Sequence, residues 1–518
     1  RPSRCAKRNL NSLAIEDPEE CRCLPLSLSP HVLGGSMKLN SIQRDRALGA
    51  IFASAAGDAL GANYEFQPPV PSSQPISMHE GSWALGEWTD DTAMAAIILY
   101  ALAAGDDLDD PITQDTIVEG WCRWAGTAPD VGIHTRQLLS GLRRRTAEEA
   151  LQASEYVHQV TGKTAGNGTL MRTGPVALGS LGSAQQTAVN ARALSKLTHW
   201  DDDAADACVL WSLAIRHAIL EGVLDVRIGL TELPEQNRRR WNDLIDDAER
   251  HPASYFSNNG WVIHAFQAAW SAIHQAMSVP TNELQFEADR LALGLEYAVR
   301  AGFDTDTVAA IAGSLLGARF GLTAVPATWV SKLHGQPLDG VRHLRTLANL
   351  AISGGDTDQD GWPLVDHFDY SAFPDRFEFA QFELDPGLYL GGVGSLRTLP
   401  SQVTAVVSLC RLGEEDIPKH VTAAHEVLLI DSSDPAKNQH LDYTFATTAA
   451  LVKELRDAGH KVFLHCVQSQ SRTPSVALTY AVRELGHDLR AASDAVQRTL
   501  PRSSPNLRFT HVLQGLLG

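Results

Sequence analysis

The feature that most constrains the fold is a series of long apolar segments, rich in alanine and glycine, between Asp45 and about Leu333. They are AIFASAAGDALGANYEF, TAMAAIILYALAAG, ADACVLWSLAIRHAIL, VIHAFQAAWSAIHQAM and TVAAIAGSLLGARFG. Each segment is longer than an ordinary strand, and no convincing set of alternating strands lies between them. The many small residues let helices approach one another closely. The pattern therefore predicts a compact all-α domain, to which we assign residues 37–350.

The pattern changes beyond residue 384. GLYLGG, VTAVVSL, EVLLI and KVFLHC are short β-type runs, and helical segments such as FATTAALVKELRDAG follow or separate them. Strands that alternate with helices predict a small α/β domain with a largely parallel sheet over residues 385–518. Residues 351–384 are rich in Gly, Asp and Pro, and we expect a linker there. Residues 1–36 lack the apolar core of a signal peptide, so we interpret them as a disordered leader or an artificial extension.

The charge and the cysteines limit the class of protein. The 518 residues carry a formal net charge of -18, and the resulting field disfavours generic binding to nucleic acid or to an anionic membrane. No run of about 18 apolar residues indicates a membrane span. The seven cysteines are scattered, which is typical of a protein in a reducing compartment. We therefore expect a cytoplasmic location.

Two acidic clusters precede two of the predicted helices. In GEWTDDTAM, Asp90 and Asp91 stand before an apolar run, and in GFDTDTV, Asp304 and Asp306 do the same. One side-chain acceptor is enough to cap a helix, so each cluster has a surplus carboxylate. Carboxylates brought together need cations to neutralise them, and ligands that offer only oxygen favour Mg²⁺ over Mn²⁺ or Ca²⁺. Two independent helix caps are the alternative.

A third acidic stretch, GGDTDQDGW, imitates the opening of a calcium loop with Asp356, Asp358, Asp360 and Gly361. The Glu that closes such a loop is replaced by His367, and no pair of helices flanks the stretch. We interpret it as part of the linker.

Five ordered motifs resemble those of the ADP-ribosylglycohydrolase family: GDALGANYEF, GEWTDDTAM, GNGTLMR, SKLTH and GFDTDTVAAIAGSLLGARFGLTAVPATWVSKL. The resemblance, over about 45–335, implies an orthogonal all-α fold that binds ADP-ribose at a centre of two Mg²⁺ ions. It implies as metal ligands Thr89, Asp90, Asp91, Asp304, Asp306 and Thr307. It also implies that Gly166, Asn167 and Gly168 approach the phosphates and that His199 lines the ADP-ribose site.

The chemistry of such a site assigns further roles. Glu65 matches a mobile carboxylate that closes over the metals in some family members, whereas we expect Asp58 to be structural and to fix the turn before that segment. Cleavage at the anomeric carbon develops oxocarbenium character, so water must be delivered to one face beside a carboxylate base. Two metal ions can hold the ribose diol and polarise that water. We predict Asp90 or Asp91 as the base and Glu65 as a gate or leaving-group partner.

A second site is predicted at the end of KVFLHC. Cys466 and Arg472 have the spacing C-x5-R, with His465 before the Cys and a helix directly after the Arg. A loop between a strand and a helix points backbone N–H groups at an anion, and the helix dipole together with Arg472 favours the thiolate. Arg472 can hold a phosphate by two hydrogen bonds while Cys466 attacks phosphorus.

The surroundings of this loop resemble a dual-specificity protein phosphatase domain over residues 385–518, in GLYLGG, VTAVVSL, EVLLID, HCVQSQSRT and SPNLRF. The resemblance implies a general-acid Asp after EVLLI, with Asp431 as first choice and Asp434 as second. Ser471 and Thr473 match substrate-site hydroxyls, one of which helps the thiolate leave. Ser469 stands where Gly is usual, so its side chain narrows the loop or changes the backbone angle. A phosphate-binding domain without turnover is the alternative.

Together these interpretations predict a bifunctional enzyme. One half is an Mg²⁺-dependent hydrolase that releases ADP-ribose from an ADP-ribosylated protein or small molecule. The other is a cysteine-dependent phosphatase that acts on a phosphoprotein or a phosphorylated small molecule. The alternatives are an α domain that binds ADP-ribose without cleaving it, or one that regulates the phosphatase. The sequence does not specify which ADP-ribosyl linkage is cleaved.

Overall fold

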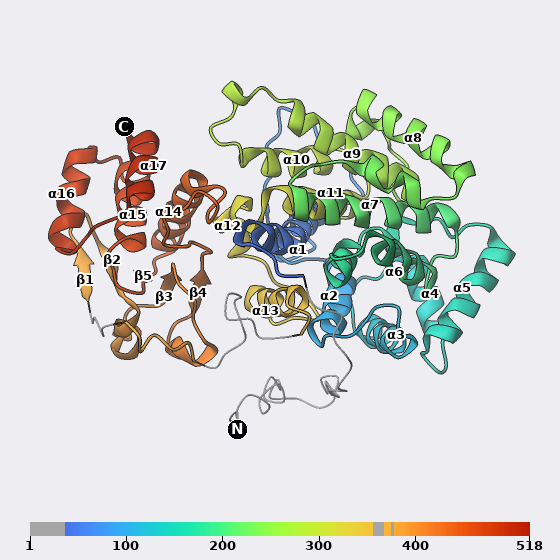
Figure 1. Ribbon diagram of the computed structural model, residues 1–518, viewed down its shortest axis with the longest axis horizontal. Helices are drawn as coiled ribbons and strands as arrows, with labels where there is room; N and C mark the ends of the chain where they lie inside the picture. Colours follow the sequence, from blue (N-terminus) through green and yellow to red (C-terminus); the bar gives the residue numbers. More distant parts are fainter. Residues whose placement is uncertain (1–36, 356–366, 374–377) are drawn as a thin grey trace.

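The computed structural model describes residues 37–355, 367–373 and 378–518, which form two adjoining lobes (Figure 1). Over residues 37–355 the regular elements are helices and short helical turns, apart from isolated bridges, which confirms the all-α prediction. The α-helices of this lobe are α1 (Ser41–Gly61), α2 (Asp90–Ala103), α3 (Pro111–Ala125), α4 (Ile133–Gly141), α5 (Ala147–Thr161), α6 (Ala184–Lys196), α7 (Asp202–Glu221), α8 (Glu235–Arg250), α9 (Val262–Ser278), α10 (Asp289–Val299), α11 (Thr305–Phe320), α12 (Ala327–Val330) and α13 (Val341–Ile352). Most of each of the five apolar segments lies in a helix, namely α1, α2, α7, α9 and α11.

Helices α1 and α11 pack backbone against backbone through glycines. A Cβ added at Gly317 would lie 1.9 Å from the carbonyl oxygen of Gly49, and one added at Gly61 would lie 2.5 Å from the backbone nitrogen of Asp306. Only glycine fits so close an approach. Because the end of α1 meets the start of α11, the two helices run antiparallel, and the acidic N-terminus of α11 lies at the C-terminus of α1.

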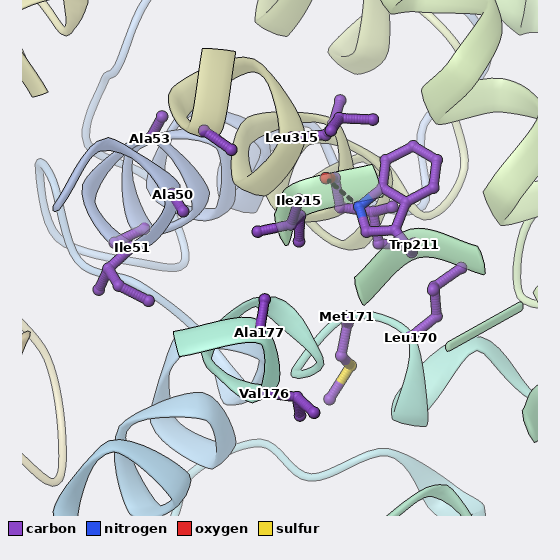
Figure 2. Packing of buried hydrophobic residues seen from close by; sticks show 14 of the residues in the cluster. Ala50, Ile51, Ala53, Leu170, Met171, Val176, Ala177, Trp211, Ile215 and Leu315 are labelled. Carbon is purple, nitrogen blue, oxygen red and sulfur yellow. Dashed lines mark hydrogen bonds between the residues drawn. The ribbon is translucent and has the colours of Figure 1, made fainter. Parts of the chain in front are cut away.

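Larger side chains fix α11 against its other neighbours. Figure 2 shows Trp211 of α7 near Leu315 of α11, in the core beside α1. The Trp211 indole N–H donates to the Ile311 carbonyl at 3.1 Å and to the Ser314 hydroxyl at 3.0 Å. A buried indole requires such a partner. The position of α11, and of the acidic residues at its start, is therefore set by packing on two sides.

The close contact of α1 with α11 gives a first prediction. We expect Gly317→Ala to lower the free energy of unfolding by about 3 kcal/mol, because the added methyl group forces the two backbones apart. Urea unfolding measures the loss. Gly141→Ala is a matched control, since a Cβ there meets nothing within 4 Å. An equal effect of the two substitutions would contradict the prediction.

The C-terminal lobe is a five-stranded sheet with helices packed on it (Figure 1). Its strands are β1 (Phe379–Phe382), β2 (Asp385–Gly392), β3 (Ala405–Ser408), β4 (Ala423–Glu426) and β5 (Val462–Cys466), and its α-helices are α14 (Leu441–Asp457), α15 (Arg472–Thr479), α16 (Leu489–Thr499) and α17 (Leu507–Leu517). The strand order is β1-β2-β5-β3-β4, and only β1 pairs antiparallel. The prediction of a small, largely parallel α/β sheet is confirmed, with Leu464 of the central β5 paired between Leu390 and Val407.

Two predicted boundaries were wrong. Strand β1 lies within residues 351–384, which we assigned to the linker, because FAQF pairs with β2 despite its mixed polarity. The predicted strand EVLLI is not a strand beyond Glu426: the backbone of Ile430 instead bonds the side chain of Asn438. The proposed leader 1–36 and the residues Asp356, Asp358, Asp360 and Gly361 lie outside the described residues. Within the described part of the chain, none of the helices has the length and apolar character needed to cross a bilayer.

The two lobes share a packed interface along α14, which lies beside α12 in Figure 1. Tyr443 and Ala446 of α14 belong to the hydrophobic core of the helical lobe. Across the same interface the amide of Ala327 donates to the Thr447 hydroxyl at 2.8 Å, and Lys332 forms an ion pair with Glu454 at 2.5 Å. The lobes are therefore joined by side-chain packing as well as by the chain itself.

Candidate active sites

The predicted acidic clusters meet where α1 ends and where α2 and α11 begin. Asp58, Asp91 and Asp306 each offer a carboxylate oxygen within 4.8 Å of the others, and so do Glu65, Asp304 and Asp306. Asp58, Asp91 and Asp306 are at most 3% exposed. The N-termini of α2 and α11 both point their partial positive charge at this position. The helices thus bring together the carboxylates that the sequence places more than 200 residues apart.

Asp58 has a different role from the one predicted. Its Oδ1 accepts from the Thr89 amide at 2.8 Å, and its Oδ2 accepts from the Thr92 amide at 2.9 Å and the Thr92 hydroxyl at 2.6 Å. Asp58 therefore has a structural role, but its side chain caps α2 from the end of α1 rather than fixing the turn before the Glu65 segment. Thr89 does not cap the helix with its side chain, and its hydroxyl donates to Asp91 at 2.9 Å.

Asp90 and Asp91, adjacent in sequence, point to different surroundings. Asp91 lies in the buried group with Asp306, whereas a carboxylate oxygen of Asp90 accepts from the amide of Gly132 at 3.0 Å. Thr307, also predicted as a ligand, is buried in the first turn of α11, where its amide donates to Asp306 at 2.9 Å. The structure therefore separates the two aspartates that the sequence left as equal candidates for the base.

Burial and mutual repulsion favour the neutral forms of these carboxyl groups. Burial raises the pKa of Asp58 to about 6, that of Asp90 to about 7 and that of Glu65 to about 8, and it raises the pKa values of Asp91 and Asp306 well above their ordinary range. Neighbouring carboxylates add to the effect at Glu65, Asp91 and Asp306. A cation bound among these carboxyl groups would remove the free-energy cost of ionising them.

The donor set fits a hard divalent cation. The buried Oδ1 of Asp91 has no hydrogen-bond partner among the described residues, although an orphaned buried acceptor is costly. The surrounding donors are carboxylate and hydroxyl oxygens, the ligands that Mg²⁺, Mn²⁺ and Ca²⁺ prefer. Asp58 was missed as a member of this group; the signal was a charged residue inside an Ala- and Gly-rich helix.

The glycine turn predicted to approach phosphates is tied to the acidic site. The Asn167 side-chain amide donates to Asp304 Oδ2 at 2.8 Å and to the Asn259 carbonyl at 2.8 Å. Asn259, which the sequence analysis missed, accepts from the Asp304 amide at 3.2 Å. His199 is 1% exposed and lies under the turn, 3.2 Å from a Cβ position at Gly166. Burial lowers its pKa well below the ordinary value, so the ring is neutral and supports the turn.

Two exposed phenylalanines with left-handed backbone stand next to acidic-site residues. Phe66 and Phe303 both have φ of 61°, and they follow Glu65 and precede Asp304 respectively. The Phe66 amide donates to the Phe303 carbonyl at 2.6 Å, and the Phe303 amide donates to the Gln67 carbonyl at 2.7 Å. This pairing holds a conformation that bulky residues rarely adopt.

The strain at Phe303 gives a second prediction. We expect Phe303→Gly to raise the free energy of unfolding by about 1 kcal/mol, because glycine adopts positive φ without a Cβ clash. Thermal unfolding in the presence of a chelator measures the change. Phe373→Gly, a substitution at another exposed phenylalanine without positive φ, should not stabilise the protein. A lower stability of Phe303→Gly would show that side-chain contacts outweigh the strain.

The C-x5-R loop lies at the end of β5, as predicted. Cys466 is the last residue of β5, is 2% exposed, and Arg472 begins α15. Nη1 of Arg472 donates to the Leu409 carbonyl at 2.5 Å and to the Leu429 carbonyl at 3.3 Å. Ser469 has φ of 58° and is fully buried, and its hydroxyl has no partner among the described residues. The backbone at this position therefore has the conformation that favours glycine.

The structure distinguishes the two candidate acids. Asp431 accepts hydrogen bonds at 2.8 Å from the Ser471 hydroxyl and from the Asn506 side-chain amide, and it lies 3.9 Å from Arg472 Nε. Asp434 instead accepts from the amide of Ala436 within its own turn. Asn506, in the SPNLRF motif, was missed as a site residue; its position at the start of α17 was the available signal.

Two predicted residues near the loop make structural contacts. The Thr473 hydroxyl donates to the Gly391 carbonyl at 3.5 Å. Nε2 of His465 lies 2.8 Å from the Ser408 hydroxyl, and burial lowers its pKa to about 4. The neutral His465 ring thus joins β5 to β3 beneath the loop.

Comparison with known proteins identifies the family. The chain is 30% identical over 327 residues to the ADP-ribosyl-dinitrogen reductase glycohydrolase of Rhodospirillum rubrum, covering 60% of this chain and 98% of that protein. It is 28% identical over 299 residues to ADP-ribosylarginine hydrolase Tri1 of Pseudomonas putida (strain GB-1), covering 56% and 74% respectively. Among solved structures, human DUSP28 is 23% identical with a TM-score of 0.24, covering 27% of this chain and 93% of that one. The ADP-ribosylglycohydrolase profile matches residues 39–360, more than half of this chain, which therefore belongs to the ADP-ribosylglycohydrolase family.

Proposed function

We propose that the helical lobe hydrolyses an ADP-ribosyl linkage and releases ADP-ribose from a modified protein or small molecule, with two Mg²⁺ ions or Mn²⁺ as cofactor. One observation carries the proposal. In a chain of this family, the ends of α1, α2 and α11 hold a buried group of carboxylates, one oxygen of which lacks a partner among the described residues.

Five of the six predicted ligands would hold the ions, with Asp58 as an additional donor that also caps α2: Thr89, Asp91, Asp304, Asp306 and Thr307. When bound, Mg²⁺ neutralises these carboxylates, binds the ribose diol and makes a coordinated water more acidic. Asn167 and Asn259 keep the Asp304 carboxylate in place through the hydrogen bonds described above.

The chain's own groups then move the proton and gate the site. Asp90 lies outside the two groups of converging carboxylates, so we assign it, rather than Asp91, as the base that takes a proton from water. Glu65 is half-buried and converges with Asp304 and Asp306, and it would serve as gate or leaving-group partner. Water would attack the anomeric carbon while its proton passes to Asp90. The glycosidic bond would break, the departing atom would take a proton, from Glu65 where that carboxyl is the leaving-group partner, and ADP-ribose would leave with its new hydroxyl.

Release of ADP-ribose tests this function. Peptides carrying ADP-ribosyl-arginine or ADP-ribosyl-serine are incubated with the full chain, with Mg²⁺ or with a chelator, and free ADP-ribose is measured. Mg²⁺-dependent release from at least one peptide is expected. ADP-ribose binding without release from either peptide would favour the alternative, a regulatory domain that binds ADP-ribose.

We also infer a cysteine-dependent phosphatase in the C-terminal lobe. The observation that favours it is the convergence of Cys466, Arg472 and the Asn506-held Asp431 at one strand-to-helix loop. Cys466 would attack phosphorus, Arg472 would turn from the carbonyls it now bonds to hold the phosphoryl oxygens, and Asp431 would protonate the leaving oxygen. Water would then release phosphate from the cysteine.

The backbone at Ser469 gives a third prediction. We expect Ser469→Gly to raise the kcat for p-nitrophenyl phosphate and to stabilise the protein by about 1 kcal/mol, because glycine adopts this φ freely and leaves no buried hydroxyl unpaired. Steady-state kinetics and thermal unfolding measure the two effects. Wild-type and Ser469→Gly proteins that both bind vanadate but hydrolyse no phosphate ester would favour the alternative, a phosphate-binding domain without turnover.

A further inference from the structure

The segment between β4 and α14, residues 427–440, carries Asp431, and we call it the acid loop. Both of its ends contact the helical lobe. These contacts are made in addition to the packing of Tyr443 and Ala446 of α14 and to the covalent connection between the lobes. They bear on how the cysteine site is assembled.

The first contact is made just before the acid loop. Glu426 ends β4, and its carboxylate lies 3.6 Å from Arg342 and 3.7 Å from Arg345, both on α13 of the helical lobe. Arg345 also donates to the Glu426 carbonyl at 2.9 Å. The side chains of Glu426 and Arg345 are 9% and 12% exposed, so water screens this pair weakly. Helix α13 therefore holds the point where the loop leaves the sheet.

The second contact is made at the other end of the acid loop. Nε2 of His440 lies 2.8 Å from the carbonyl of Phe320, the last residue of α11, and His440 is 7% exposed. The carbonyls of the last turn of a helix have no hydrogen-bond donor within the helix. The His440 ring therefore supplies a partner for the Phe320 carbonyl. The same helix carries Asp304 and Asp306 at its opposite end. Helix α11 thus reaches from the acidic site to the acid loop.

Within the acid loop, one side chain transmits this anchoring to the acid. Asn438 accepts from the Ile430 amide at 2.9 Å and donates to the Ile430 carbonyl at 2.8 Å. Ile430 directly precedes Asp431, and the neighbouring Leu429 carbonyl accepts from Arg472 at 3.3 Å. Displacement of His440 would move Asn438, two residues before it, and with it the backbone of Asp431.

We propose that Glu426 and His440 are positioning residues through which the helical lobe holds Asp431 in place to protonate the leaving group, so that the cysteine site is complete only in the full chain. The inference rests on the phosphatase function proposed above. Substitution of Glu426 or His440 should weaken general-acid catalysis by Asp431 but leave the attack of Cys466 on phosphorus unchanged.

Leaving groups of different basicity separate these two steps. Phenyl phosphate needs a proton on its leaving oxygen more than p-nitrophenyl phosphate does. We expect His440→Ala to lower kcat for phenyl phosphate by about 10-fold more than kcat for p-nitrophenyl phosphate, as Asp431→Asn should do. His440→Gln keeps a donor and should restore part of the loss. Alkylation of Cys466 by iodoacetamide should be unchanged.

A control variant tests whether any weakened contact between lobes has the same effect. Lys332→Met removes the ion pair with Glu454, which joins the lobes away from the acid loop. It should leave the ratio of the two kcat values unchanged. Equal losses on both phosphate esters in His440→Ala and Glu426→Gln, or the same altered ratio in Lys332→Met, would overturn the proposal.

Failure of the phosphatase function itself would be visible separately. If the wild-type chain hydrolyses neither ester, the proposed phosphatase function is wrong. Hydrogen exchange then tests separately whether Glu426 and His440 anchor the acid loop. His440→Ala should then accelerate amide exchange at residues 429–438, including Ile430, more than Lys332→Met does. Unchanged protection there would overturn the anchoring as well.

Discussion

Asp306→Asn is expected to lower kcat/KM for ADP-ribose release by about 10³-fold or more, because Asp306 belongs to both groups of converging carboxylates. No other residue is shared by the two groups within the described chain. The amide that replaces the carboxylate carries no charge and binds a divalent cation poorly. Rates measured at saturating Mg²⁺ on the linkage that the wild type cleaves test the expectation.

The same substitution should have the opposite effect on stability when metal is absent. In a chelator, Asp306→Asn removes a carboxyl group that burial and its neighbours force into the neutral form at a cost in stability, so the free energy of unfolding should rise. Addition of Mg²⁺ should stabilise the wild type and not the variant. Asp107→Asn, at an exposed aspartate, is the control and should change neither activity nor stabilisation by Mg²⁺.

The pH dependence of the chelated wild type follows from the same groups. Their pKa values are raised in the folded state, to about 7 at Asp90 and about 8 at Glu65, so the folded protein binds more protons than the unfolded chain. Stability is then fully present below the ordinary carboxyl pKa values and is lost as pH rises through about 7 to 8. Mg²⁺ should remove this loss. An Mg²⁺-independent stability profile, together with full activity of Asp306→Asn, would contradict the metal site.

The sequence predicted those features that local pattern determines. The long apolar segments predicted the helices. The acidic clusters that contain Asp90 and Asp304 have more carboxylates than a helix cap needs, which indicated that the starts of two helices converge. It did not show that Asp58 caps α2, since the amides of Thr89 and Thr92 are 31 and 34 residues away. Nor did it distinguish Asp90 from Asp91. The fold separates them: Asp91 converges with Asp58 and Asp306, whereas Asp90 accepts from the amide of Gly132 on a distant loop.

The cysteine site shows the same limit. C-x5-R and a following helix were enough to place Cys466 and Arg472 at a strand end, because strand and helix periodicity are local. The sequence ranked Asp431 above Asp434 from its place after EVLLI, but it did not show the bond that Asp431 accepts from Asn506, 75 residues later. The predicted end of β4 was wrong because residues 427–430 are apolar enough for a strand. In the structure the Asn438 side chain, not a neighbouring strand, forms hydrogen bonds with the backbone of Ile430.

Cys466→Ser is expected to lower the hydrolysis of p-nitrophenyl phosphate at least about 10³-fold while ADP-ribose release stays unchanged. A serine hydroxyl remains protonated at neutral pH and is a poor nucleophile without a general base that removes its proton. Asp306→Asn should give the reverse pattern. The two substitutions together assign each activity to its lobe.

A second buried thiol provides the matched control for this experiment. Cys410 lies just after β3 of the same sheet and is 3% exposed, but it is not at the start of the C-x5-R loop. Cys410→Ser should therefore keep phosphatase turnover, apart from a loss of stability that thermal unfolding would reveal. Because the lobes share a packed interface, ADP-ribose release in Cys466→Ser also reports whether the helical lobe is intact. If Cys466→Ser retains full turnover, Cys466 is not the nucleophile, and if it abolishes ADP-ribose release as well, the two sites are not independent.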